Sequence, residues 1–289
     1  MTENDESRRD LLRLVAGATA AATALGMAGA AGAQLQRGGP INAPAAADHT
    51  MPTAPSSTLP GPRPQIAMLI HPKMVLLDLV GALTAFNIAQ CDVYLVWKER
   101  VPVRFEVGIE FPPSATFDEC PRNLDAIVVP GGIMGTIACM NDPVVLAFLA
   151  DRAKTAKWVV SICTGGLTIA AAGLLRGYKA ATFWPVMDIL PIMGAIPTHE
   201  RVVVDRNRIT CGGVTSGIDL ALVLVAKLRS EAVAKRVQLM IEYAPHPPFH
   251  SGTPEEADPA LVAEIRTSRL GMDGMARTAA QAAAKRFGI

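Results

Sequence analysis

Short apolar runs recur through the middle of the chain, and each ends at a Gly, a Pro or a polar residue. Runs of this kind that are rich in Val, Ile and Leu predict buried strands. They lie at residues 65–70, 92–97, 126–129 and 159–162. Longer Ala- and Leu-rich runs between and after them predict helices at residues 76–89, 143–155, 212–227 and 231–242. Strands that alternate with helices predict a parallel sheet that is covered on both faces.

Weaker patterns fill the rest of the chain. Residues 103–109 predict an extended excursion, either a strand or a hairpin at the sheet edge. Residues 180–183 predict a short strand, and Trp184-Pro185 begins a further helix. Residues 202–211 predict a hairpin that turns at Arg206-Asn207. After a Pro-rich stretch from Tyr243, residues 259–266 and 275–286 predict two separate helices, on the surface or on a second subunit.

The N-terminus has the features of an export leader. Ser7-Arg8-Arg9-Asp10-Leu11-Leu12 is similar to the twin-arginine motif, and an Ala/Gly-rich run ends in the small residues Ala31-Gly32-Ala33. We therefore expect a signal peptide at residues 1–33, with Gln34 as the first mature residue and a periplasmic or secreted product. An uncleaved anchor is the alternative, but Ala and Gly make a poor membrane span, so no stable membrane insertion is expected.

The Pro/Ala-rich residues 34–64 predict a disordered linker, followed by one α/β domain at residues 65–267 and a helical tail at 268–289. The net charge of +1 and the 5% aromatic content disfavour nucleic acid as a partner. The five cysteines have no close CxxC spacing, so no zinc or other metal site is expected.

The strongest chemical signal is a cysteine between a predicted strand and a predicted helix. The run 159–162 stops at Cys163, and Gly165-Gly166 opens an Ala/Leu-rich segment. A side chain on such a sharp turn is held exposed at the positive end of a helix dipole, which favours a thiolate. The pattern predicts a nucleophile elbow at Cys163, with a small buried hydrophobe as the alternative.

Two further turns follow predicted strands and are expected at the same edge of the sheet. Asp78 is either a helix N-cap or a partly buried acid that faces Cys163, in which case its pKa would be raised and it could serve as a general acid. The backbone N–H groups of Gly132 and Thr164 could hold a developing negative charge, although Pro130-Gly131-Gly132 could also be an ordinary tight turn.

No histidine has a spacing that places it beside Cys163. Solvated loop positions are the expectation for His71, His199, His246 and His250. Cys211 is expected to pack in the core.

Four segments resemble the PfpI-like, class I glutamine amidotransferase-like superfamily: 129–132 (VPGG), 161–166 (SICTGG), 171–177 (AAGLLRG) and 212–219 (GGVTSGID). Residues 238–243 and 247–249 extend the resemblance toward its isonitrile hydratase (cyclohexyl-isocyanide hydratase) branch. The resemblance covers residues 65–267. It implies a flavodoxin-like three-layer α/β sandwich, with a mostly parallel sheet and a cysteine nucleophile elbow.

The resemblance also assigns roles residue by residue. It implies that Cys163 is the nucleophile, that Asp78 is the catalytic acid, and that Thr164 and Gly212 line the pocket. Phe183 departs from the pattern, because relatives commonly have His between the Thr and the Trp at this place. Ala82 is a second departure, since relatives often have Pro after Gly81.

The implied activity is that of a cysteine-dependent hydro-lyase, which adds water to a small-molecule isonitrile to give an N-substituted formamide through a thioimidate. No cofactor is implied, and superfamily members are commonly homodimers. One alternative is a redox- or stress-responsive cysteine protein without hydratase activity. Another is a ligand-binding module like those of transcription regulators, which the export leader disfavours.

Overall fold

The computed structural model describes residues 39, 41 and 59–289. The predicted leader and nearly all of the predicted linker lie outside these residues. Contacts divide the chain into residues 1–35 and a second unit, 36–289, and all of the described residues belong to the second unit.

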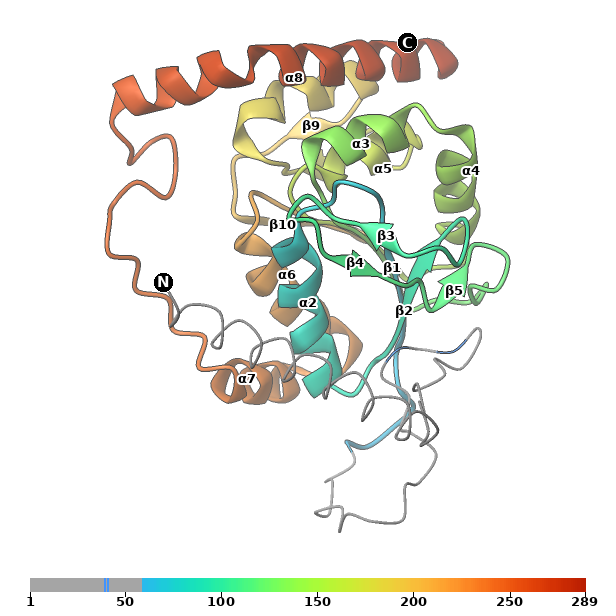
Figure 1. Ribbon diagram of the computed structural model, residues 1–289. Helices are drawn as coiled ribbons and strands as arrows, with labels where there is room; N and C mark the ends of the chain where they lie inside the picture. Colours follow the sequence, from blue (N-terminus) through green and yellow to red (C-terminus); the bar gives the residue numbers. More distant parts are fainter. Residues whose placement is uncertain (1–38, 40, 42–58) are drawn as a thin grey trace, which may run out of the picture. The chain divides into compact units, whose positions relative to one another are not determined.

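A seven-stranded sheet forms the centre of this unit, with the order β10-β11-β7-β6-β1-β2-β5 (Figure 1). All neighbouring strands run parallel except β10 and β11, which form the predicted hairpin. The strands are β1 (Gln65–Leu69), β2 (Asp92–Trp97), β5 (Ala115–Thr116), β6 (Ala126–Val129), β7 (Trp158–Ser161), β10 (Val202–Asp205) and β11 (Arg208–Cys211). The predicted mostly parallel α/β sheet is confirmed.

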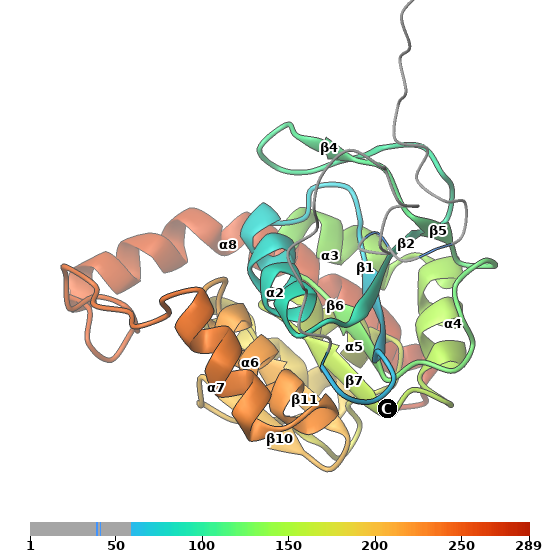
Figure 2. The same cartoon turned by 90° about the horizontal axis from the view of Figure 1, so that it is seen from below.

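Helices cover both faces of the sheet, as Figure 2 shows from below. One face carries α2 (Leu76–Ile88), α6 (Ser216–Leu228) and α7 (Glu231–Met240). The other carries α3 (Ile133–Met140), α4 (Pro143–Arg152), α5 (Gly165–Ala171), the 3-10 helix η1 (Trp184–Met193) and α8 (Pro259–Arg286). The three-layer sandwich expected from the resemblance is therefore present.

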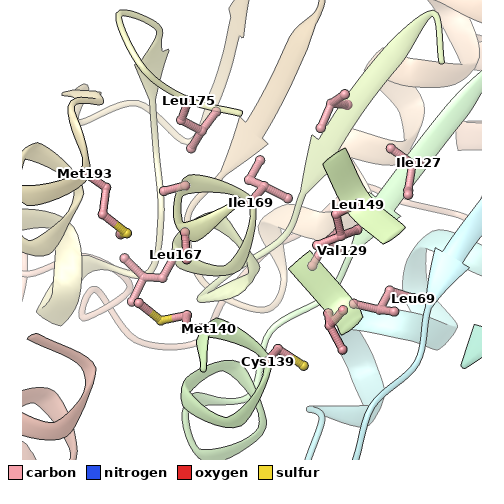
Figure 3. Close-up of a cluster of buried hydrophobic side chains, with 14 of the residues drawn as sticks. Leu69, Ile127, Val129, Cys139, Met140, Leu149, Leu167, Ile169, Leu175 and Met193 are labelled. Atoms are coloured by element: carbon pink, nitrogen blue, oxygen red, sulfur yellow. The ribbon is translucent and has the colours of Figure 1, made fainter. Parts of the chain in front are cut away.

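Each face of the sheet has its own apolar core. Side chains alternate between the two faces along a strand, so Leu69 and Ile127 enter one core while Met68 and Val128 enter the other. Figure 3 shows the first core, in which Leu69, Ile127 and Val129 from the strands meet Leu149, Leu167 and Ile169 from the helices. Burial on both faces explains why the strands appear in the sequence as continuous apolar runs.

Some local predictions hold in detail. The Asp142 carboxylate accepts hydrogen bonds from the N–H groups of Val144 and Val145, which caps α4 with Pro143 at its first position. Arg206, in the turn of the β10–β11 hairpin, has a φ of 51°.

Other predictions are wrong. Helix α3 was not predicted, because its sequence follows the Gly-rich turn and is too short to show a clear helical period. For residues 103–109 the hairpin alternative is confirmed, since β3 (Val103–Arg104) pairs antiparallel with β4 (Glu110–Phe111), but this hairpin is a separate two-stranded sheet and not an edge of the main one. The strand predicted at 180–183 is the shorter β8 (Lys179–Ala180), which pairs with β9 (Ile196–Pro197).

The C-terminal region forms one helix instead of the predicted two. Helix α8 is continuous over 28 residues and lies along η1, α3 and α5 (Figure 1). Its second half buries a row of alanines, which allow the close approach: Ala276, Ala279, Ala280, Ala283 and Ala284. The expected boundary between residues 267 and 268 falls inside this helix.

Among the described helices, none is by itself long and apolar enough to cross a membrane. Helices α3 and α4, which are bent by 85° at their junction, reach that length and composition only as a pair.

The contact between α5 and β6 predicts a strong effect of one added methyl group. A Cβ on Gly165 would lie 2.0 Å from the carbonyl oxygen of Val129. We expect Gly165→Ala to lower the free energy of unfolding in urea by at least about 2 kcal/mol. The control is Gly271→Ala in α8, where a Cβ meets nothing within 4 Å. The free energy of unfolding of this control variant should rise by about 0.5–1 kcal/mol, because alanine favours the helix more than glycine does. Equal stability of the two variants would contradict the close contact between Gly165 and Val129.

Candidate active site

Three neighbouring strands, β7, β6 and β1, bring the candidate residues to the same edge of the sheet. Cys163 follows β7, the Gly131-Gly132 turn follows β6, and Asp78 lies in the first turn of the helix that comes after β1. Because the three strands are parallel, their carboxyl ends meet there, where open α/β sheets form their sites.

The backbone of Cys163 is held in a left-handed conformation, with a φ of 55°. Such a conformation is costly for a residue with a side chain, so the surroundings must hold it. The Cys163 N–H donates to the carbonyl oxygen of Gly212 at 2.9 Å, and the Thr182 hydroxyl donates to the Cys163 carbonyl oxygen at 2.7 Å. Cys163 therefore lies on a strained elbow that is fixed from both sides.

Asp78 is a buried acid and not a helix N-cap. Its side chain is fully inaccessible, and Val75 occupies the cap position of α2. The Asp78 Oδ2 atom accepts a hydrogen bond from the Gly131 N–H at 2.8 Å, whereas Oδ1 has no partner among the described residues. A carboxyl group with one free, buried oxygen is able to carry a proton toward a reacting group.

The electrostatics differ from the sequence-based expectation of a thiolate at Cys163. Cys163 is 3% exposed, and burial together with the charge of Asp78 raises the pKa of its thiol well above the usual value. The N–H groups of Thr164 and Val214 bond to the sulfur and oppose this effect only in part. Burial also raises the pKa of Asp78 to about 7, while the Gly131 hydrogen bond lowers it. The thiol and the carboxyl group therefore hold at most one negative charge near neutral pH.

The predicted oxyanion donors are not both free. The Gly132 N–H donates to the Thr164 hydroxyl at 2.9 Å, and that hydroxyl also lies 2.8 Å from the Thr136 hydroxyl. The donors that face the sulfur are the N–H groups of Thr164 and Val214. The Gly132 part of the prediction needs this correction, because the Thr164 side chain occupies the position expected for the anion.

Gly131 allows the two turns to touch. A Cβ at this residue would lie 2.7 Å from the Thr164 nitrogen and 2.9 Å from the Cys163 Cβ. A side chain here would push the β6–α3 turn away from the elbow. Pro130-Gly131-Gly132 is thus more than an ordinary tight turn.

A pocket with a volume of about 200 Å³ lies next to the elbow, on the far side of Gly212 and Thr182, and neither Cys163 nor Asp78 lines it. Gly212 and Gly213 line it, together with Thr182 and Trp184. Its outer wall includes residues 252–255, which precede α8, and the side of η1 that carries Met187. Trp184 and Met187 thus give the pocket an apolar side, whereas Glu200, Arg201 and Glu255 bring charged side chains to its lining. Gly212 belongs to the loop whose carbonyl accepts the Cys163 N–H.

Phe183 is packed into this region, where relatives commonly have a histidine. A Cβ on Gly213 would lie 3.1 Å from its ring, and the Arg269 guanidinium of α8 lies 5.0 Å from the ring centroid. The helix that the sequence placed on the surface or on a second subunit thus contributes a cation over a ring beside the site.

Thr136, Thr182 and Val214 were not predicted as site residues. Thr136 belongs to the unpredicted helix α3, and the other two act through a hydroxyl–backbone bond and a backbone N–H. Such bonds leave no signal in residue type or spacing.

The expectation of a solvated loop position is wrong for His71, which is completely buried. His246 and His250 are exposed, and His199 lines the pocket. All five cysteines are buried, no disulfide joins any of them in the described structure, and Cys211 packs in the core as predicted. Within residues 59–289, no group of three or more His, Cys, Asp or Glu side chains is arranged to hold a metal ion.

The raised pKa of Asp78 predicts a specific dependence of stability on pH. An acid whose pKa is about 7 in the folded state and 3.8 otherwise stabilises the fold below pH 4 and loses that contribution as the pH rises to 7. Asp78→Asn cannot ionise. The difference in free energy of unfolding between Asp78→Asn and the wild type should therefore shift in favour of the variant between pH 4.5 and pH 8, by about 3 kcal/mol. Parallel stability curves for the two proteins in urea titrations would contradict the burial of an ionisable Asp78.

Comparison with known proteins places this site in a family. Residues 64–227 match the DJ-1/PfpI family. The chain is similar to an isonitrile hydratase from Pseudomonas putida, with 46% identity over 203 residues that cover 70% of this chain and 88% of that protein.

Solved structures agree with this assignment. A THiJ/PfpI family protein from Pseudomonas syringae superposes with a TM-score of 0.71 and 43% identity, covering 82% of this chain and 98% of that one. Oxidized DJ-1 from Toxoplasma gondii shares the fold, with a TM-score of 0.58 and 23% identity over 63% of this chain and all of that one. The chain thus belongs to the DJ-1/PfpI family.

Proposed function

We propose that the protein hydrates an isonitrile to an N-substituted formamide, with Cys163 as the nucleophile and Asp78 as the acid and base. The observation that carries this proposal is the pairing of a strained, buried cysteine with a buried carboxyl group whose Oδ1 atom has no partner in the described structure. The 46% identity to an isonitrile hydratase supports the choice of substrate class.

The first step joins the sulfur to the terminal carbon of the isonitrile. The Cys163 thiolate forms the C–S bond, and the proton held by Asp78 goes to the same carbon, which gives a thioimidate and an ionised Asp78. The N–H groups of Thr164 and Val214, which bond to the sulfur, support the thiolate before the attack.

The second step uses water and returns the enzyme to its starting state. Ionised Asp78 takes one proton from a water molecule as the water oxygen adds to the thioimidate carbon. The second proton of that water, on the newly added hydroxyl group, moves to the nitrogen of the substrate. The C–S bond then breaks, which leaves the N-substituted formamide and the Cys163 thiolate, and Asp78 keeps the proton. One water is consumed for each isonitrile, and the step needs no oxidant or reductant.

The substituent of the isonitrile would lie in the pocket beside Gly212. Its volume of about 200 Å³ and its Trp184 and Met187 side chains suit a compact apolar group. Phe183 packs against Gly213, one of the residues that line the pocket, and places an aromatic ring where a histidine would be polar.

The decisive experiment measures formamide production by the purified protein on a panel of small isonitriles. Cys163→Ala should lower turnover by at least about 10³-fold, because the covalent route is lost. The matched control is Cys91→Ala, since Cys91 is buried before β2, at the opposite edge of the sheet, and should leave turnover unchanged. Full turnover by Cys163→Ala would end the proposal. Reversible oxidation of Cys163 without any turnover would instead favour a redox-responsive protein.

The pH dependence of kcat/KM tests the role of Asp78. The reactive pair carries one negative charge, so kcat/KM should rise as the pair loses its first proton near pH 7. Asp78→Asn should lose both this rise and most of the activity. A wild-type profile that is flat between pH 5 and pH 9 would contradict the assignment.

We also propose that the chain is exported through its twin-arginine leader and acts as a homodimer outside the cytoplasm. The sequence of residues 1–33 is the support for export. The full chain should appear in the periplasmic or extracellular fraction with Gln34 at its N-terminus. An Arg8→Lys, Arg9→Lys variant should stay in the cytoplasm, and equal export of the two chains would refute the route.

A further inference from the structure

His71 is a buried histidine that the proposed mechanism does not use. It lies two residues after the end of β1, and its side chain is completely inaccessible. Its Nδ1 atom lies 3.1 Å from the carbonyl oxygen of Pro72, and its Nε2 atom lies 3.3 Å from the carbonyl oxygen of Pro130. The ring thus lies between the turn after β1 and the turn after β6.

The Pro130 carbonyl belongs to the same peptide unit as the Gly131 N–H. A peptide unit is planar and trans, so its C=O and N–H point in opposite directions and turn together. His71 contacts the carbonyl oxygen of this peptide unit, and Asp78 Oδ2 accepts a hydrogen bond from the N–H of the same unit at 2.8 Å. A continuous chain therefore runs from the imidazole through one peptide to the acid.

The packing around His71 shows that this position is enforced. A Cβ on Gly135 of α3 would lie 2.3 Å from Nδ1 of His71 and 2.2 Å from the Pro72 carbonyl oxygen. The helix thus approaches the ring so closely that only a glycine fits, and the ring has no room to turn away from the two carbonyls.

We infer that His71 is a positioning residue, whose imidazole donates from Nε2 to the Pro130 carbonyl and thereby aims the Gly131 N–H at Asp78. The inference takes the role of Asp78 from the proposed function, but it concerns the state of the carboxyl group and not the substrate.

The protonation state of the ring fits this role. Burial lowers the pKa of His71, so the ring is neutral at physiological pH and has one N–H to donate. With its proton on Nε2, the ring donates a hydrogen bond to the Pro130 carbonyl oxygen. With its proton on Nδ1, it donates to the Pro72 carbonyl oxygen instead, and the Pro130–Gly131 peptide unit that binds Asp78 loses this hydrogen bond. The two tautomers therefore predict different effects of substitutions that replace one nitrogen at a time.

The readout is the titration of Asp78 itself, followed by the carboxyl ¹³C signal that Asp78→Asn removes. The groups whose charges act on Asp78 or are affected by it are Glu106, Cys163 and Cys211, and all remain in the variants. In the wild type the pKa should be about 7. In His71→Phe, the less well aimed Gly131 N–H should stabilise the carboxylate less, which raises the pKa of Asp78 by about one unit. The amide proton signal of Gly131 should shift with it.

Two polar variants separate the contacts. His71→Gln can place its amide NH₂ near the former Nε2 atom and should restore the wild-type titration. His71→Asn reaches only toward Pro72 and should behave like His71→Phe. The control is His246→Phe, a substitution at an exposed histidine, which should leave the Asp78 signal unchanged.

An unshifted Asp78 titration in folded His71→Phe or His71→Asn would overturn the inference, as would rescue by Asn instead of Gln. If the Phe variant does not fold, the Gln and Asn pair carries the same test. The readout needs no substrate, so a protein without isonitrile turnover can still confirm the role of His71. Failure of the proposed function and failure of the His71 inference can therefore be told apart.

Discussion

The site depends on the contact between two backbone turns at the carboxyl edge of the sheet. Gly131, at the end of β6, lies so close to the elbow after β7 that a Cβ would collide with Cys163 and Thr164. This contact explains how a residue with a φ of 55° is tolerated at the elbow, because the neighbouring strand and the bond to Gly212 leave it little freedom. It also brings the Gly131 N–H to Asp78, so one glycine lies against both Cys163 and Asp78.

Burial then determines the chemistry of these groups. An isolated cysteine at the start of a helix would favour its thiolate, but at Cys163 the loss of solvent outweighs the helix dipole and the two N–H donors. Burial acts in the same direction on Asp78. The result is a neighbouring pair that holds at most one negative charge near neutral pH, and the proposed addition, which needs a nucleophile and a proton at the same carbon, rests on this pair.

Helix α8 links a segment outside the matched family region to the surroundings of the site. It packs through small alanines on η1 and α3, and it places Arg269 over Phe183. The pocket beside Gly212 is therefore shaped partly by residues far along the chain, including those just before α8. This arrangement gives the C-terminal region a structural role near the pocket.

The sequence by itself determined the parallel sheet, its helices on two faces and the elbow at Cys163, because apolar periodicity and glycine-rich turns are local properties. It also indicated Asp78, but left open whether this residue was a cap or an acid. Only the tertiary structure decided that Asp78 is buried against Gly131, that the Gly132 N–H is occupied by Thr164, and that His71 lies inside the protein. These outcomes depend on hydrogen bonds and desolvation between segments 32 to 59 residues apart, which no local pattern encodes.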